Sequence, residues 1–217
     1  MVHLNTSMQR NVIQTLGSIA HNLNIRDKYS EGHALRVSVY SKRLAARLNL
    51  PKEEIENIRM GGLLHDIGKV GFSDNVFRNE KRRPPKEIRD EIRKHPSIGR
   101  IILKNLHLLS AVIDYVYCHH EREDGSGYPR GIIGEKIPLG AKIIAIADTF
   151  DAITTDRPYQ KGRTPAEALV ILRKDSGKKF DSRLVEAFIA EIEENGVLEK
   201  ALFPDQTNNG FCSYKHK

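Results

Sequence analysis

Tryptophan is absent from this 217-residue chain, and cysteine is rare. The two cysteines, Cys118 and Cys212, are too few for a disulfide framework, so reduced thiols are expected. Long apolar runs are also missing, since the strongest, IIAIA at 143–147, is far shorter than a membrane span requires. The N-terminal stretch MVHLNTSMQRNVIQ lacks the apolar segment of a signal peptide. These absences argue against a disulfide-stabilised secreted protein and an integral membrane protein, and they predict a cytoplasmic location.

The composition is that of an ordinary soluble globular protein, with 39% hydrophobic and 29% charged residues. The length suffices for a real core within one large domain, or within one domain that carries a small appendage. The formal net charge of +7 favours anionic partners such as nucleotides, nucleic acid or acidic lipid. Charge alone does not choose among these partners.

Apolar residues recur at helical spacing along most of the chain, and no alternating strand pairs are found. Helices are expected at 12–23, 35–48, 51–70, 86–103, 109–120, 141–154, 165–174 and 181–195. The range 109–120 would also suit a strand because it is rich in β-branched residues. Thr164 with Glu167 forms a capping box, and Asp181 is a second helix cap. We therefore predict an all-α fold, a single helical bundle with long loops at 72–85 and 121–140.

The histidines are expected to carry the chemistry. Five of the nine lie at buried edges of helical patterns, and each one alone would more often be a satisfied core residue than a metal ligand. Two aspartates also lie in apolar runs, where a carboxylate is costly unless it is paired or binds a cation. A shared metal centre would account for all seven side chains: His33, His65, Asp66, His95, His119, His120 and Asp148.

Imidazole and carboxylate ligands without thiolate favour Fe, Mn, Zn, Ni or Co. Seven ligands exceed what one tetrahedral zinc needs, so two metals bridged by Asp66 are expected, with zinc in separate sites as the weaker alternative. Such a pair clamps a phosphoryl group and ionises a bridging water. Lys69 lies four residues after His65, on the same face of a continuous helix. It could hold a phosphate oxygen or protonate a leaving alkoxide, while a surface lysine or a plain ion pair to Asp66 is the structural alternative.

Several motifs, taken in order, resemble the HD-GYP family. This is the branch of the HD phosphohydrolase superfamily that hydrolyses cyclic dinucleotides, chiefly cyclic di-GMP. The motifs are HDIGK at 65–69, HHE at 119–121, DGSGYP at 124–129, ADTFDAITTDRPYQK at 147–161 and GKKFDSRLVEAF at 177–188. A lone HD pair would be a weak signal, whereas this series, with His33 upstream and His95 in between, is specific. The resemblance covers most of the chain.

The resemblance implies an HD-domain helical bundle with additional C-terminal helices and a GYP-containing loop. We expect an N-terminal connecting helix at 1–19, an HD-GYP catalytic domain at 20–196 and a loosely ordered tail at 197–217. The seven side chains match the family's metal ligands, with Asp66 and Lys69 in catalytic positions and Lys69 on the scissile phosphate. Further substrate contacts are implied for Arg157 and for the GYP element, which consists of Gly127, Tyr128 and Pro129.

The implied activity is a metal-dependent phosphodiesterase that hydrolyses cyclic di-GMP to pGpG, with GMP as a possible second product. A water bridging two metals would be the nucleophile, with Fe or Mn preferred and Zn, Ni or Co as alternatives. Diguanylate cyclases (GGDEF proteins) at the GYP loop and a second copy of the chain at the N-terminal helix are possible partners, whereas nucleic acid and membrane are not expected. A non-catalytic receptor for a cyclic dinucleotide and an HD hydrolase for another nucleotide are the alternatives.

Three positions depart from the family pattern. Tyr29 stands where some members have a glutamate that helps bind a third metal, so two metals are expected. Gln160 occupies a position that is often basic, which would weaken one phosphate contact. Glu123 stands where an aromatic or basic residue is common, and its effect is left open.

Asp151, three residues after Asp148, is expected either to orient a ligand or to form a structural ion pair or cap.

Overall fold

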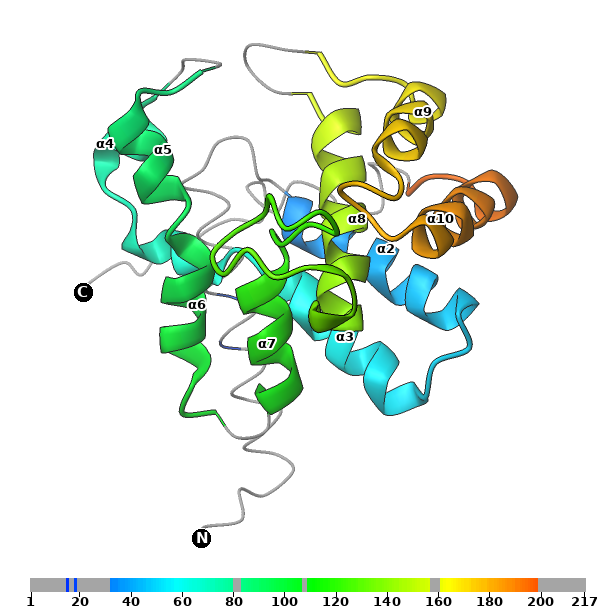
Figure 1. Ribbon diagram of the computed structural model, residues 1–217, viewed down its shortest axis with the longest axis horizontal. Coiled ribbons are helices and arrows are strands. Elements are labelled where there is room, and N and C mark those ends of the chain that lie inside the picture. The colour runs from blue at the N-terminus through cyan, green and yellow to red at the C-terminus, as the bar shows by residue number, and fades with distance from the viewer. Residues whose placement is uncertain are drawn as a thin grey trace, which may run out of the picture.

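A computed structural model describes residues 15, 18, 32–79, 83–106, 109–156 and 161–198. The α-helices in this part are α2 (His33–Arg47), α3 (Lys52–Leu64), α4 (Asp74–Phe77), α5 (Lys86–Ile92), α6 (His95–Leu103), α7 (Ser110–Cys118), α8 (Leu139–Thr154), α9 (Pro165–Asp175) and α10 (Ser182–Asn195) (Figure 1). Two short 3-10 helices are η1 (Ile67–Gly71) and η3 (Gly134–Lys136). Among these described residues there is no β-strand, only an isolated bridge between Ser176 and Phe180. The all-α prediction is confirmed, and the ambiguous range 109–120 is helical.

Helix α8 is the central element of the bundle. It packs against α2, α3, α7, α9 and α10, and in Figure 1 it runs between α6 and α7 on one side and α9 and α10 on the other. Its residues Ile143, Ile146 and Phe150 are fully buried, and they join Leu44 of α2 and Phe188 of α10 in the main hydrophobic cluster. A helix that is apolar on nearly all sides must be covered on all sides, which explains its central place.

The predicted helix starts are confirmed. The hydroxyl of Thr164 accepts a hydrogen bond from the backbone N–H of Glu167, whose carboxylate accepts one from the Thr164 N–H, so the capping box is complete. The Asp181 carboxylate accepts from the N–H of Arg183 at the start of α10.

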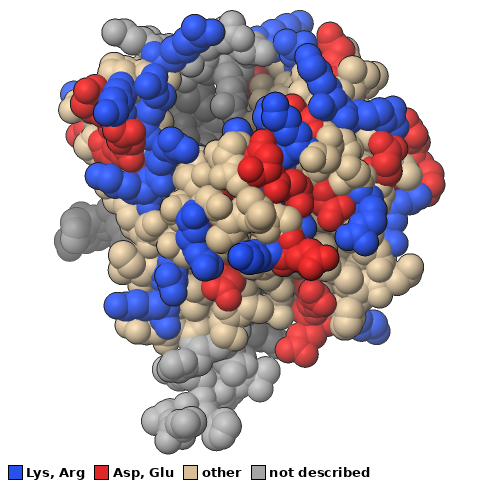
Figure 2. Space-filling view, in the orientation of Figure 1, with Lys and Arg blue, Asp and Glu red and all other residues tan. Residues whose placement is uncertain are grey.

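The outer surface carries side chains of both charge signs (Figure 2), and no residue of α5 is buried.

Two of the expected helices are interrupted. The range 51–70 is not one helix, because α3 ends at Leu64 and the backbone continues into the 3-10 helix η1. The range 86–103 divides into α5 and α6, with Pro96 in the first turn of α6. Proline lacks an N–H and its ring clashes with the preceding turn, so it fits a helix start and not a helix interior.

The buried face of α2 also differs from the apolar stripe from which this helix was predicted, namely Leu35, Val39, Leu44 and Leu48. Leu35 is 44% exposed, whereas Ala34, Val37 and Leu44 are buried. The face turned inward is decided by the packing of α2 against α3 and α8, which the spacing of leucines alone does not reveal. Of the expected helix at 12–23, only Thr15 and Ser18 are described and both are helical; the rest lies outside the described residues, as does the tail after residue 198.

A glycine allows two ligand-bearing segments to approach closely. A Cβ atom on Gly68 would lie 1.9 Å from the carbonyl oxygen of His95 and 2.7 Å from the backbone nitrogen of Gly99. The backbone of η1 therefore lies directly on α6, which no residue with a side chain would permit without movement. This contact brings the turn that carries His65 and Asp66 next to His95.

Candidate metal centre

The seven predicted ligands come from five separate elements that meet at one place. His33 is the first residue of α2, His95 is the first residue of α6, and Asp148 lies within α8. The remaining four follow directly on helix ends: His65 and Asp66 after α3, and His119 and His120 after α7. Six of the seven residues form two groups, and within each group the ligand atoms lie within 4.8 Å of one another. The first group is His33, His65 and Asp66, and the second is His95, His119 and His120.

Asp66 lies between these two groups. Its Oδ2 is 3.3 Å from the Nε2 of His65, and its Oδ1 is 3.4 Å from the Nε2 of His95. Asp148 joins the first group, with its Oδ1 3.3 Å from the Nε2 of His33. The two oxygens of Asp66 thus face different histidine groups, which is the arrangement that a bridging carboxylate requires.

Backbone carbonyls fix the orientation of three of the histidine rings. In each case the ring Nδ1 lies within hydrogen-bond distance of the carbonyl oxygen three residues earlier. The pairs are His65 with Gly62 (2.8 Å), His95 with Ile92 (2.7 Å) and His119 with Val116 (2.7 Å). Because a carbonyl can only accept, each Nδ1 carries a proton, and the Nε2 of each ring is left to face the centre.

These Nε2 atoms converge, and the described residues supply no clear donor to them. The Nε2 atoms of His95 and His119 are only 3.2 Å apart, and the buried Nε2 of His65 has no hydrogen-bond partner among the described residues. Protonation is disfavoured, because burial holds the pKa of His119 well below its usual value and lowers the pKa of His120 to about 3. Metal cations would satisfy all of these nitrogens at once, so the donor set fits metal ions.

The two carboxylates of the centre are ionised. Burial by itself would raise the pKa of Asp66, but the nearby charge of Lys69 outweighs it and holds that pKa well below its usual range. The pKa of Asp148 is lowered in the same way, chiefly by its hydrogen bond from His33. Burial would lower the pKa of His33, yet its bonds to Asp148 and Asp151 raise it to about 9. The centre therefore combines anionic oxygens with imidazole nitrogens, and a divalent cation that binds His33 would displace a proton from it.

Lys69 is placed differently from what the sequence indicated. The prediction that Lys69 and His65 lie on the same face of a continuous helix is wrong, because the α-helix ends before His65 and Lys69 belongs to η1. In the 3-10 helix its ammonium nitrogen instead lies 2.7 Å from the Oδ2 of Asp66. The ion pair that was the structural alternative is thus present, and it holds the ammonium at the edge of the centre with 22% of the side chain exposed.

The GYP loop borders the centre through Tyr128. Its ring stacks on that of His120, with centroids 4.7 Å apart, and its N–H donates to the His120 carbonyl at 3.1 Å. The guanidinium of Arg93 lies 4.8 Å from the same ring's centroid. Gly127 passes so close to the preceding turn that a Cβ there would lie 2.5 Å from the Cα of Glu121. The loop is therefore held against a predicted metal ligand.

Some contributors to the site had only weak sequence signals. The buried Glu121 carboxylate accepts the N–H groups of Arg130 at 2.7 Å and Ile132 at 3.1 Å, which fixes the far side of the GYP loop. Arg36 binds Asp151, and its position one turn after His33 was the available signal.

The predicted contact Arg157, together with Tyr29 and Gln160, lies outside the described residues. Glu123 pairs with Lys142 at 2.8 Å.

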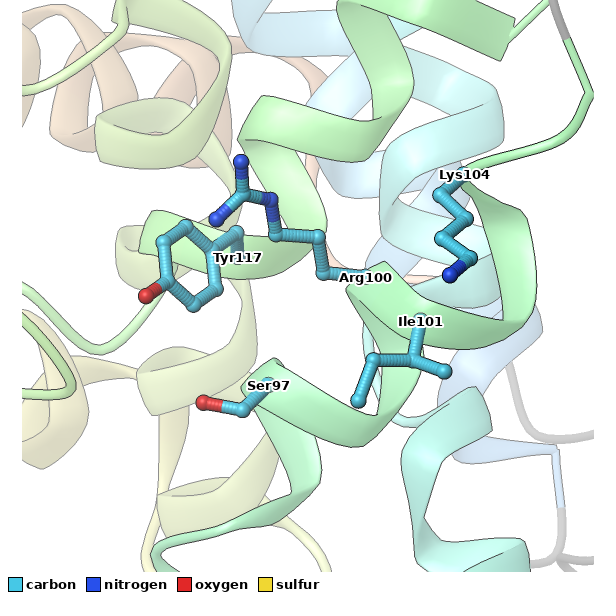
Figure 3. Close-up of a pocket in the computed structure, with 5 residues that line it drawn as sticks. All are labelled: Ser97, Arg100, Ile101, Lys104 and Tyr117. Atoms are coloured by element: carbon cyan, nitrogen blue, oxygen red, sulfur yellow. The ribbon is translucent and has the colours of Figure 1, made fainter.

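A separate hollow lies on the outer side of α6 and α7 (Figure 3). Its volume is about 300 Å3, and the guanidinium of Arg100 lies 4.7 Å from the ring centroid of Tyr117 at its edge. Its lining residues are Ser97, Arg100, Ile101, Lys104 and Tyr117. None of the predicted ligands lines it, so it is distinct from the metal centre.

Comparison with known proteins identifies the family. The sequence model of the HD domain family matches residues 17–184. The chain therefore belongs to the HD domain family, as its resemblance to the HD-GYP branch predicted. No helix in the described part of the chain is long and apolar enough to cross a bilayer.

Similar proteins carry the names of cyclic-dinucleotide phosphodiesterases. The chain is 36% identical over 189 residues to the cyclic di-GMP phosphodiesterase response regulator RpfG of Xanthomonas campestris, covering 83% of this chain and 49% of that protein. It is 32% identical over 170 residues to a 3′3′-cGAMP-specific phosphodiesterase 3 of Vibrio cholerae, covering 78% and 36%. A crystal structure of a cyclic GMP-AMP specific phosphodiesterase from V. cholerae has the same fold, with a TM-score of 0.67 at 22% identity, covering 84% and 49%. The chain spans about half the length of these relatives, or less.

Proposed function

We propose that this chain contains the catalytic domain of a metal-dependent phosphodiesterase that hydrolyses cyclic di-GMP to pGpG, with GMP as a possible second product. One observation carries the proposal: the Nε2 atoms of several histidines, among them a His65 Nε2 with no partner in the described part of the chain, converge with two ionised carboxylates around a single centre. The names of the similar proteins supply the substrate class. A phosphodiester is the substrate that such a centre suits, because it presents anionic oxygens to paired cations.

The proposed centre holds two divalent metals, with Fe or Mn preferred and Zn, Ni or Co as alternatives. One position would be formed by His33, His65, Asp66 and Asp148. The other would be formed by His95, His119 and His120, and it would share Asp66. When bound, the metals would supply Lewis-acid charge and lower the pKa of a water to about 7.

The reaction forms a bond between phosphorus and a water oxygen and breaks the bond from phosphorus to the ribose 3′ oxygen. The ammonium of Lys69, held 2.7 Å from Asp66, would neutralise charge that develops on the phosphoryl oxygens. It could also give a proton to the leaving 3′ oxygen, as could solvent. Arg157 and the GYP residues remain proposed substrate contacts, with Tyr128 the one that borders the centre through His120.

The test is direct turnover. The chain is stripped of metal, loaded in turn with Fe2+ (without oxygen), Mn2+, Zn2+, Ni2+ or Co2+, and incubated with cyclic di-GMP. We expect pGpG by chromatography with at least one metal, and none from an Asp66→Asn variant. Binding of cyclic di-GMP without turnover under any of these metals would instead favour the non-catalytic receptor.

A second substrate is favoured by one specific observation, the 32% identity to a 3′3′-cGAMP-specific enzyme. Equal amounts of cyclic di-GMP, 3′3′-cGAMP and a mononucleotide are offered together, and their rates of loss are compared. Preferred loss of cyclic di-GMP supports the first proposal, and preferred loss of 3′3′-cGAMP supports the second. Loss of the mononucleotide alone would indicate an HD hydrolase of another class.

We further propose the domain organisation expected from the sequence: a connecting helix at 1–19, the catalytic domain at 20–196 and a tail at 197–217. The family match at 17–184 supports the position of the central part. Pairing of two chains through the N-terminal helix is tested by light scattering across working concentrations, where a monomer throughout would exclude it. Contact of a GGDEF protein with the GYP loop is tested by binding to the wild-type chain and to a Tyr128→Ala variant.

A further inference from the structure

His33 is oriented in a different way from the other histidines of the centre. His65, His95 and His119 each use a backbone carbonyl of their own preceding turn. His33, the first residue of α2, is held by a side chain of another helix. Its Nδ1 instead lies 2.7 Å from the Oδ2 of Asp151, which belongs to α8.

Asp151 is itself held rigidly. It is only 1% exposed, and Arg36 donates to both of its oxygens, from Nε to Oδ1 at 2.6 Å and from a terminal nitrogen to Oδ2 at 3.0 Å. The same guanidinium also donates to the hydroxyl of Thr155 at 3.2 Å. A two-point contact of this kind fixes the plane of the carboxylate as well as its position. The carboxylate therefore presents one oxygen to His33 in a defined direction.

We propose that Arg36 and Asp151 form a positioning pair that controls one metal position selectively. The inference rests on the proposed two-metal centre. The carboxylate keeps the proton on the Nδ1 of His33, which directs Nε2 toward Asp148, 3.3 Å away. A carboxylate partner also makes a ligating imidazole a stronger donor. The metal position that contains His33 thus depends on the Asp151 side chain, whereas the histidines of the other metal position do not contact Asp151.

The chain contains a matched control for this pair. Arg43, also on α2, donates from Nε to the Oε1 of Glu191 at 2.8 Å, and Glu191 is 6% exposed. This second pair joins α2 to α10 and touches none of the proposed ligands. The substitutions Asp151→Asn and Glu191→Gln each remove one negative charge from a buried carboxylate that binds an arginine of α2. Only the first should affect metal binding.

The experiment measures Mn2+ binding to the metal-stripped full chain by the loss of the free-ion electron paramagnetic resonance signal. We expect two ions for the wild type and for Glu191→Gln. We expect Asp151→Asn to retain one ion with unchanged affinity and to bind the other about 10- to 100-fold more weakly. Because Asp151 acts through His33, adding Asp151→Asn to His33→Ala should cause no further loss. Circular dichroism of each metal-stripped variant checks that the chain is folded.

Other outcomes would overturn the inference. If Asp151→Asn binds two ions as tightly as the wild type does, the Arg36–Asp151 pair has a purely structural role, and the proposed function is unaffected. Equal weakening of both ions would refute the selectivity. Fewer than two ions in the wild type would refute the two-metal centre itself. If Asp151→Asn does not fold, Arg36→Gln, which keeps the carboxylate, should weaken the same single position, and two tightly bound ions would again contradict the pair's role.

Discussion

Addition of Mn2+ to the metal-stripped chain is expected to raise its thermal unfolding midpoint, because the folded centre gathers acceptors for which the described residues supply no clear donors. The Nε2 of His65 is buried with no hydrogen-bond partner in the described part of the chain, and the Nε2 atoms of His95 and His119 face each other at 3.2 Å. The unfolded chain does not gather these groups, since they come from separate helices. The ion therefore binds the native state preferentially and stabilises it by mass action.

The size of the shift follows from this linkage. An ion at 100 times its dissociation constant stabilises the native state by about 2.7 kcal/mol, so two independent ions contribute about 5 kcal/mol. For a domain of this size, 1 kcal/mol moves the midpoint by about 2 to 4 °C. The expected increase is therefore on the order of 10 to 20 °C for two ions and about half of that for one.

The assay is circular dichroism at rising temperature, with the same protein in chelator, in saturating Mn2+ and in Ca2+. Ca2+ is the control ion because it prefers oxygen ligands, whereas this centre is rich in imidazole. A His119→Ala variant should lose a large part of the Mn2+ effect. The reasoning is refuted if saturating Mn2+ leaves the midpoint unchanged, or if Ca2+ raises it as much as Mn2+ does.

Three further changes test other parts of the structure. Replacing Lys69 by methionine should lower kcat on the cyclic dinucleotide by about 100-fold while both metals are retained, because a positioned donor is lost; an unchanged kcat would contradict this role. Gly68→Ala would place a methyl group 1.9 Å from the carbonyl oxygen of His95, so urea unfolding should show a loss of about 2 to 3 kcal/mol. Gly71→Ala, whose Cβ would have the Cδ1 of the Ile98 side chain as its nearest neighbour at 3.0 Å, is the matched control, and equal losses would contradict the close packing. Thr164→Ala removes the capping box of α9 and should cost about 1 kcal/mol in urea without altering turnover, whereas an altered turnover would connect α9 to the site.

Local sequence signals predicted the fold well where a helix is defined by its own residues. The capping box at Thr164 and the cap at Asp181 are examples, because the groups that form each cap lie within a few residues of each other. The same reasoning failed at 51–70 and at 86–103. The recurrence of apolar residues at helical spacing indicates which positions are buried. This recurrence continues where an α-helix changes to a 3-10 helix and where proline breaks a helix. Continuity of the backbone hydrogen bonds is not visible in that pattern.

The residue types alone determined that this chain could hold metals. Histidines and aspartates in apolar runs need partners, and no local cation was available for most of them. The tertiary structure decided how those groups meet. It determined which oxygen of Asp66 faces which histidine and placed the Lys69 ammonium beside Asp66. It also brought His33 into contact with Asp151, which lies 118 positions later in the chain. The physical reason is that the packing of helices such as α2 against α8 sets these distances, and that packing depends on buried surfaces contributed from the whole chain.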